Sequence, residues 1–226
     1  MPHPHREHLV ALVPQKTLAR TKTRLRSVLS REARTELSLQ MLRHVLDVCR
    51  RSGVAEAVLL CGPVELQALA DEFGAELLEG GEKGMRRDVS AAAAHPLIAG
   101  RAAMLFVSSD LPLLAPEDLE AVVAPWRAGL DLVLAPDRRE RGTNAMLVNE
   151  PEVFPYAFGE AVGAGSFHTH RDQAIGHDMH LDVVRRPGLQ LDVDLPEDIA
   201  ELISRAPEDP VAQFCAARYH EQYRFE

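Results

Sequence analysis

Residues 9–25 read LVALVPQKTLARTKTRL, an apolar run that breaks at Pro14 into a basic loop. The apolar part has the length and composition of a buried β-strand. From residue 16 to residue 34 the chain has seven Lys or Arg and a single acid, Glu32, although the whole protein carries a formal net charge of −9. Open α/β sheets bind ligands beyond the carboxyl ends of their strands, so this loop indicates a site for a compact anion such as polyphosphate. A solvated basic face is the alternative interpretation.

The length and composition favour a single domain. The 226 residues are 46% hydrophobic and 26% charged, which is enough for one ample core without a second domain. We therefore expect one domain over residues 1–226, with its core in about residues 8–204 and a charged, aromatic tail over 207–226. The sequence pI of about 5.6 argues against nucleic-acid or membrane-surface partners, since both need broad positive potential.

The N-terminus and the cysteines indicate a cytoplasmic protein. Residues 1–8 (MPHPHREH) contain no apolar signal-peptide segment, and no apolar run approaches the roughly 20 residues of a membrane-spanning helix. Cys49, Cys61 and Cys215 lie far apart without a CxxC motif, so we expect ordinary thiols rather than disulfide partners or zinc ligands.

Strand-like and helix-like segments alternate along the rest of the chain. Helical spacing of apolar residues over 31–51, followed by Gly53, predicts the first helix. Further strands are expected over residues 56–61, 75–78, 101–107, 132–135, 145–148 and 180–185, and further helices over 63–73, 86–94, from 116, from 166 and over 196–204. This alternation predicts an α/β fold with a mostly parallel sheet and helices on both faces.

Carboxylates follow two of the expected elements. Asp110 in SSDLP lies just beyond the most apolar strand, where a hard dication would find a carboxylate at the ligand-binding edge. Asp192 and Asp194 in LDVDLPED face the same side of an extended segment, which would supply a second carboxylate to complete a magnesium site with Asp110. The alternative is that all these acids cap turns and helices, an interpretation that suits Glu197 and Asp198 in a first helical turn.

Two Gly-rich turns carry hydroxyl side chains. RGTN at 141–144 and GAGSF at 163–167 expose backbone N–H groups, and Thr143 and Ser166 add hydroxyl donors. Such turns suit a small phosphate or carboxylate. Together with the basic loop and the carboxylates, they predict a nucleotide site beside a small-anion site.

Four histidines and one tryptophan each allow two interpretations. His168, His170, His177 and His180 match no common structural-zinc spacing and come without a cysteine, so we expect them on the surface or against helices. Trp126 lies in an amphipathic segment, and we expect it to pack in the core rather than to stack on a base.

Five segments, in this order, resemble one known family: VPQKTLARTKTRL, SSDLPLL, RGTNAML, GAGSFHTH and LDVDLPEDI. They span about residues 8–204 and are similar to the CofC/FbiD family of guanylyltransferases. The resemblance implies a single-domain, three-layer α/β/α, MobA-like (glycosyltransferase-A-like) nucleotidyltransferase fold. It also implies transfer of GMP from GTP to a phospho-acid, with release of pyrophosphate, in coenzyme F-420 biosynthesis.

The same resemblance implies roles for individual residues. Asp110 and Asp194 would hold Mg²⁺. Thr143, Gly163 and Ser166 would bind the phospho-acid, with 2-phospho-L-lactate, phosphoenolpyruvate and 3-phosphoglycerate as the three alternatives.

The basic loop is assigned to the triphosphate and to catalysis. Lys16 and Lys22 supply mobile point charges, and Arg24 offers a planar fork for phosphate oxygens. The loop lacks both GxxxxGK[ST] and GxGxxG, so neither a P-loop nor a dinucleotide turn applies. Because the attacking phosphate oxygen is already anionic near neutral pH, we expect charge neutralisation and in-line positioning rather than a general base.

The sequence allows more than one nucleotide, more than one reaction and more than one oligomeric state. Arg86 stands where relatives have an asparagine suited to base or ribose contact, which leaves the guanine preference open. The rival functions are a cytidylyltransferase acting on a phosphonate or sugar phosphate, and a non-catalytic nucleotide-binding regulator. A homodimer is one alternative for the oligomeric state, and transfer of the product to a downstream F-420 biosynthesis enzyme is a further expected partnership.

Overall fold

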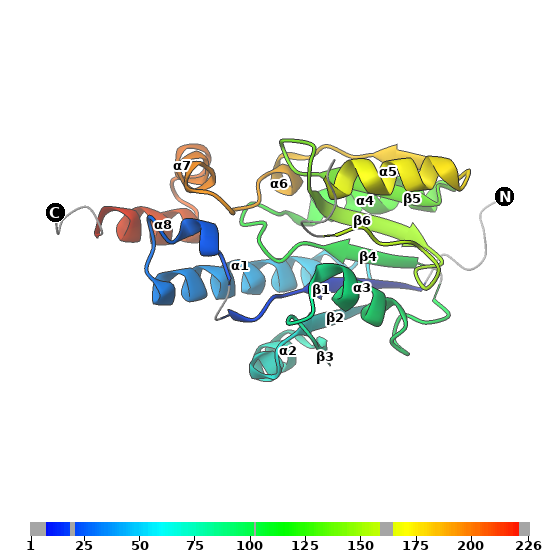
Figure 1. Cartoon of the computed structure of the whole chain (residues 1–226), viewed down its shortest axis with the longest axis horizontal. Coiled ribbons are helices and arrows are strands. Elements are labelled where there is room, and N and C mark those ends of the chain that lie inside the picture. The colour runs from blue at the N-terminus through cyan, green and yellow to red at the C-terminus, as the bar shows by residue number, and fades with distance from the viewer. Residues whose placement is uncertain (1–7, 19–20, 102, 159–164, 222–226) are drawn as a thin grey trace.

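The computed structural model describes residues 8–18, 21–101, 103–158 and 165–221, in which strands and helices alternate (Figure 1). In this part of the chain one sheet contains seven strands: β1 (Leu9–Pro14), β2 (Ala57–Gly62), β3 (Glu76–Glu79), β4 (Ala103–Val107), β5 (Leu132–Pro136), β6 (Thr143–Asn149) and β7 (Leu181–Val183). The helices are α1 (Arg31–Ser52), α2 (Gln67–Phe73), α3 (Met85–Ala93), α4 (Pro116–Arg127), α5 (Ser166–Gly176), α6 (Pro187–Gln190), α7 (Pro196–Arg205) and α8 (Pro210–Glu221), with 3-10 turns η2 (Thr23–Leu25) and η3 (Val64–Leu66). None of these described helices is both long and apolar enough to span a membrane.

The element predictions are confirmed, with bounds shifted by a few residues. The first helix begins after Ser30, whose hydroxyl accepts a hydrogen bond from the Ala33 N–H at 3.1 Å, and ends at Gly53 with φ +63°. Trp126 is 1% exposed and packs in the core, as expected. The short helix α6 was not predicted from the sequence.

The strand order explains where a ligand site forms. The sheet runs β3-β2-β1-β4-β6-β5-β7, and β1 pairs in parallel with both β2 and β4. The pairs β2–β3 and β5–β7 are also parallel, whereas β6 is antiparallel to β4 and β5, so the mostly parallel prediction is confirmed. The chain moves outward from β1 to β3 and then returns to β4 on the other side of β1. This reversal makes the carboxyl ends of β1 and β4 the expected binding crevice.

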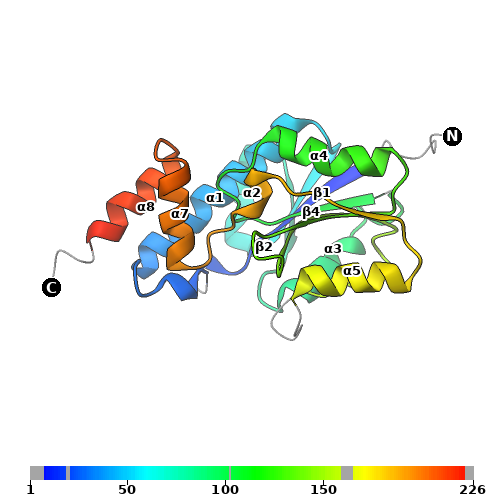
Figure 2. The same cartoon turned by 90° about the horizontal axis from the view of Figure 1, so that it is seen from above.

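Helices cover both faces of the sheet, as Figure 2 shows from above. One apolar cluster joins the sheet to α1, α2 and α4, and a second joins it to α3 and α5. Strand β1 contributes to both, because its successive side chains point to opposite faces. Ala11 and Val13 belong to the first cluster, and Val10 and Leu12 to the second. The three-layer α/β/α architecture is therefore confirmed.

A third cluster lies beyond the end of the sheet, where α7, α8 and the first turns of α1 meet. Within residues 207–226, expected from the sequence as a charged, aromatic tail, the structure contains the helix α8. Val211, Ala212 and Cys215 are buried in this cluster, so the helix has a narrow apolar stripe that packs on α1 and α7. The charged residues around that stripe hid the helical signal.

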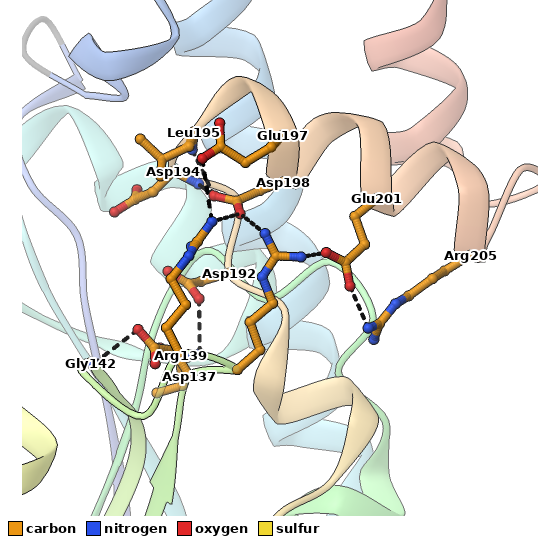
Figure 3. Close-up of polar contacts among 12 residues, drawn as sticks. Asp137, Arg139, Gly142, Asp192, Asp194, Leu195, Glu197, Asp198, Glu201 and Arg205 are labelled. Carbon is orange, nitrogen blue, oxygen red and sulfur yellow. Dashed lines mark hydrogen bonds and ion pairs between the residues drawn. The ribbon is translucent and has the colours of Figure 1, made fainter.

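A buried carboxylate fixes the start of α7 (Figure 3). Asp198 is 0% exposed, and its Oδ2 accepts hydrogen bonds from the N–H groups of Asp194 at 3.0 Å and Leu195 at 2.7 Å. Its Oδ1 accepts from Arg138 at 2.6 Å and Arg139 at 3.1 Å. The capping role expected for Asp198 is confirmed, and the same side chain ties α7 to the loop after β5.

We predict that Asp198→Asn lowers the free energy of unfolding by about 2 to 3 kcal/mol, because an amide replaces one acceptor oxygen and removes the charge that two arginines face. Urea denaturation measures the change. Glu197→Gln, one residue away and exposed, is the control and should change stability by less than about 0.5 kcal/mol. Equal stability of the two variants would contradict the prediction.

Candidate active site at the carboxyl edge of the sheet

A cleft of about 260 Å³ lies at the carboxyl ends of β1 and β4. Because β6 is antiparallel to β4, its first residues lie at the same edge, and the Ser108 N–H donates to the Asn144 carbonyl at 2.8 Å. The segment before α7 reaches the cleft through the Val193 N–H, which donates to the Asp110 carbonyl at 3.3 Å. The cleft is lined by Pro14, Gln15, Lys16, Thr21, Lys22, Ser38, Met41, Met85, Phe106, Ser108, Ser109, Asp110, Gly142, Thr143, Asn144, Phe158, Ser166, Asp192 and Asp194.

The Lys22 ammonium lies between two carboxylates of this cleft. Its Nζ is 2.5 Å from Asp110 Oδ2 and 2.8 Å from Asp194 Oδ1. The Lys22 side chain is only 7% exposed, against 18% for Asp110 and 43% for Asp194. Lys22 also has a left-handed φ of +48°, a conformation that costs a non-glycine residue on the order of 1 kcal/mol. The ion pairs offset this backbone strain.

The same contacts keep the Lys22 ammonium and the Asp194 carboxylate charged. Burial alone would lower the pKa of Lys22, but the Asp110 and Asp194 carboxylates outweigh burial and raise that pKa above its ordinary value. The Lys22 charge in turn lowers the pKa of Asp194 against the opposing effect of burial, with smaller contributions from Lys16 and Arg24. The lysine is therefore protonated and Asp194 ionised at neutral pH.

Asp192 is a third carboxylate at this place. One oxygen atom from each of Asp110, Asp192 and Asp194 lies within 4.8 Å of the others, and the described residues contain no other such group of His, Cys, Asp or Glu. Burial, and then the charges of Asp110 and Asp194, raise the pKa of Asp192 to about 7. The Asn144 amide donates to Asp192 Oδ1 at 3.2 Å. Three converging carboxylates that are only partly neutralised by one lysine form a donor set that suits a hard divalent cation.

Two hydroxyl groups lie in the part of the cleft formed by β6 and α5. Ser166 Oγ donates to Thr143 Oγ1 at 3.1 Å. Ser166 is the first residue of α5, and the preceding Gly165 has φ +92°; a Cβ there would overlap the Arg141 carbonyl oxygen. Only glycine permits this close approach, which brings the start of α5 against the turn that leads into β6. The result is a neutral, hydroxyl-bearing wall close to the carboxylates.

Most of the site residues predicted from the sequence line the cleft: Lys16, Lys22, Asp110, Thr143, Ser166 and Asp194. Arg24 is exposed on η2 and is not among the lining residues, although its charge contributes to the lowered pKa of Asp194. Gly163 lies outside the described residues.

Two features of the site were not assigned from the sequence. The family resemblance implies a metal role for Asp110 and Asp194 only, although the spacing of Asp192 and Asp194 by two residues places both on one side of the segment. His170, expected on the surface or against a helix, is 0% exposed, and its Nδ1 is 3.1 Å from Thr143 Oγ1. That contact depends on how α5 packs beside β6, which no local pattern encodes; its position four residues after Ser166 was the one available signal.

A family described as "Guanylyl transferase CofC like" matches residues 9–214 of this chain. A phosphoenolpyruvate guanylyltransferase from Rubrobacter xylanophilus is 33% identical over 192 residues, which cover 85% of this chain and 92% of the relative. A protein of the same name from Sphaerobacter thermophilus is 34% identical over 88% of this chain and 94% of its own. A 3-phospho-D-glycerate guanylyltransferase from Colwellia psychrerythraea is 28% identical over 83% of this chain and 88% of its own.

Solved structures share the fold at low sequence identity. A structure from Desulfovibrio desulfuricans G20, assigned as a nucleotide-diphospho-sugar transferase, has a TM-score of 0.74 at 14% identity and covers 94% of this chain and 97% of its own. CMP:2-keto-3-deoxy-manno-octonic acid synthetase complexed with CTP has a TM-score of 0.61 at 10% identity, covering 89% of this chain and 99% of its own. Rv0371c of Mycobacterium tuberculosis, in complex with manganese, has a TM-score of 0.51 at 16% identity, covering 87% of this chain and 98% of its own. These likenesses confirm the MobA-like nucleotidyltransferase fold.

We predict that Asp192→Asn stabilises the metal-free protein at pH 8 but not at pH 4. The raised pKa means that folded Asp192 binds a proton between about pH 4 and pH 7 that the unfolded chain has lost, so stability falls as pH rises through this window. Asparagine cannot ionise, and its Oδ1 can still accept from Asn144. Melting temperatures in EDTA should therefore be a few degrees higher for the variant at pH 8, which corresponds to about 1 kcal/mol.

The same variant should bind Mn²⁺ more weakly, since it loses one anionic oxygen ligand. Calorimetric titration measures the affinity. Asp172→Asn, an exposed carboxylate of α5, is the control and should change neither property. If Asp192→Asn melts at the wild-type temperature at pH 8, Asp192 is not destabilised by the neighbouring carboxylates. If it binds Mn²⁺ with wild-type affinity, Asp192 is not a ligand of the metal.

Proposed function

Because this chain belongs to the CofC-like family of guanylyl transferases, we propose that it transfers GMP from GTP to a small phosphorylated acid and releases pyrophosphate. Phosphoenolpyruvate is our first candidate for the acid, and 3-phosphoglycerate the second, after the activities named for the relatives. 2-Phospho-L-lactate is the third candidate. The observation that carries the proposal is the family match together with a cleft in which a lysine and three carboxylates meet beside a hydroxyl wall.

We further propose that the protein works in the cytoplasm and passes its product to the next enzyme of F-420 biosynthesis.

The donor set of the cleft supports a resident Mg²⁺. Asp110, Asp192 and Asp194 offer only carboxylate oxygens, the ligands that Mg²⁺ prefers, and a Lys22 ammonium occupies the space between two of them. Asp110 and Asp194 would hold the ion, with Asp192 as a third ligand. When bound, Mg²⁺ supplies positive charge that neutralises phosphate oxygens of the reacting groups.

The basic residues of the β1 loop would bind the triphosphate. Lys16 is exposed at the rim of the cleft, and Lys22 lies within it. A divalent cation at the carboxylates would free the Lys22 ammonium from Asp110 and Asp194, so that it can donate to phosphate oxygens instead. Arg24 stands farther out, where an exposed guanidinium can meet the terminal phosphate of an entering nucleotide.

The hydroxyl wall would bind the acceptor acid. Thr143 and Ser166 bear O–H groups, and Ser166 stands at the N-terminus of α5, where backbone N–H groups and the helix dipole favour an anion. We keep Gly163 as a third acceptor-binding residue on the family resemblance. No aromatic side chain is needed to read so small a ligand.

Transfer needs no covalent enzyme intermediate. An acceptor phosphate oxygen, already anionic near neutral pH, forms a bond to the α-phosphorus of GTP, the bond from that phosphorus to the bridging oxygen breaks, and pyrophosphate leaves. Two unit charges of like sign about 4 Å apart repel by about 4 kcal/mol at an effective dielectric of about 20. Lys16 and Lys22 reduce this repulsion and hold the two anions in line.

One assay separates this proposal from its rivals. The protein is incubated with Mg²⁺, one of GTP, CTP, ATP or UTP, and one of the phospho-acids, a phosphonate or a sugar phosphate, and pyrophosphate is measured. The proposed function requires the highest rate with GTP and a three-carbon phospho-acid. A preference for CTP with a phosphonate or sugar phosphate would identify a cytidylyltransferase, and GTP binding without any turnover would identify a regulator.

We predict that Thr143→Val raises the KM for the acceptor about 10- to 150-fold, because it removes one hydrogen bond to a charged group, worth about 1.5 to 3 kcal/mol. The KM for GTP should change by less than twofold. Steady-state kinetics with each substrate varied in turn makes the measurement. Thr169→Val, which removes a hydroxyl that donates to the Gly165 carbonyl on the same helix, is the control. An unchanged acceptor KM in Thr143→Val would show that the Thr143 hydroxyl does not bind the acceptor.

A further inference from the structure

A buried histidine lies directly behind the hydroxyl pair. His170 is in α5, one helical turn after Ser166, and is 0% exposed. The rings of Phe154 and Phe158 flank it, with centroids 5.8 and 4.7 Å from the imidazole centroid. Burial lowers the pKa of His170 to about 4, so its ring is neutral at neutral pH.

The surroundings select one of the two neutral tautomers. The Ala157 N–H donates to His170 Nε2 at 2.9 Å. A backbone N–H can only donate, so Nε2 must carry the lone pair, and the single proton of the neutral ring is on Nδ1. Nδ1 is 3.1 Å from Thr143 Oγ1, so this contact is a donation from His170 to the threonine oxygen.

This tautomer leaves the hydroxyl proton of Thr143 available to a ligand in the cleft. The Thr143 oxygen accepts from His170 at 3.1 Å and from Ser166 at 3.1 Å, which fills both of its lone pairs. Its own O–H proton is then left for a ligand. In the other tautomer Nδ1 would accept that proton, and the serine proton would still be given to Thr143, so the pair would offer an anion no donor.

We propose that His170 is a positioning residue that, through its Nδ1 proton, makes the Thr143–Ser166 pair a hydrogen-bond donor to the anionic acceptor. The inference rests on the proposed function in one respect, the assignment of this hydroxyl pair to the phospho-acid. It adds a determinant of substrate specificity. The Thr143 O–H can donate a hydrogen bond to an anionic oxygen of the acceptor, whereas a ligand that presents an O–H or N–H donor at this place finds no acceptor.

The tautomer can be tested without any reaction. In a long-range ¹H–¹⁵N spectrum of protein labelled at histidine, His170 is expected to show a protonated Nδ1 and an unprotonated Nε2 at pH 7. A His170→Gln spectrum assigns the signal. A protonated Nε2, or a doubly protonated ring, would overturn the inference whether or not the proposed function holds.

Two variants separate positioning from packing, because each keeps one of the two ring contacts. His170→Asn places an amide donor near the Nδ1 position and loses the acceptor for Ala157. His170→Gln places an acceptor near the Nε2 position and loses the donor to Thr143. Each variant loses one buried hydrogen bond, so both should melt at similar temperatures, below that of the wild type.

Their kinetics should differ. His170→Gln is expected to raise the acceptor KM about 5- to 10-fold with an unchanged KM for GTP, whereas His170→Asn should stay within about threefold of wild type. His170→Gln in a Thr143→Val background should add less than threefold, because both changes act on the same hydroxyl. His168→Gln, a half-buried histidine of the same helix, is the control and should leave the kinetics unchanged.

A purely structural histidine would make His170→Asn and His170→Gln alike in acceptor KM, and that result would overturn the inference. So would an acceptor KM within twofold of wild type in His170→Gln. Titration of phosphoenolpyruvate into the Mg²⁺-loaded wild type and both variants gives the same comparison as a dissociation constant. If the wild type transfers GMP to no acid, the proposed function fails, while the tautomer spectrum and the phosphoenolpyruvate titration still decide the role of His170.

Discussion

The contact of the Lys22 ammonium with Asp110 and Asp194 is the interaction on which the site depends. Three carboxylates that converge within 4.8 Å would repel one another strongly, since like unit charges at such separations interact by several kcal/mol at an effective dielectric of about 20. One buried lysine offsets only part of this repulsion. The Lys22 charge lowers the pKa of Asp194 and keeps it ionised, whereas burial and the charges of Asp110 and Asp194 raise the pKa of Asp192 to about 7. The site is thus left short of positive charge, a condition that favours binding of a divalent cation.

The fold stabilises this arrangement from outside the cleft. The segment with Asp192 and Asp194 belongs to none of the described strands, and Asp198 holds it by accepting two backbone N–H groups at the start of α7. Arg138 extends the connection to Glu201, which also pairs with Arg205 (Figure 3). These contacts lie away from the lining of the cleft. They place strong, satisfied ion pairs behind carboxylates that are themselves poorly neutralised, a distribution typical of sites in which function is kept at some cost in stability.

Sequence reasoning succeeded where a single segment carries the signal. The apolar run before Pro14, the helix that ends at Gly53 and Asp110 beyond the strand at 103–107 each follow from local pattern and the rule for ligand sites in α/β sheets. It failed where the outcome depends on a partner element. The burial of His170 requires α5 to pack on the sheet beside β5 and the first residue of β6, and α8 exists because Val211 and Cys215 meet the apolar residues of α1 and α7. The functional roles of all the site residues remain predictions: Lys16, Lys22, Arg24, Asp110, Thr143, Gly163, Ser166 and Asp194.

Under the proposed function, the two ends of the cleft would bind their anionic substrates by different physical means, with a cation at the carboxylates and with neutral hydroxyl groups at the other end. At the carboxylates, charge must be balanced, so affinity there should depend on the metal and on salt. At the Thr143–Ser166 pair the protein offers no formal charge, only an O–H whose direction is fixed by a neutral, buried imidazole. A neutral donor held rigidly binds an anion without introducing a new charge beside three carboxylates and a lysine. Under the proposed function, the electrostatic balance at Asp110, Asp192 and Asp194 is therefore left to the nucleotide and its cation, while the hydroxyl pair selects the acceptor by geometry.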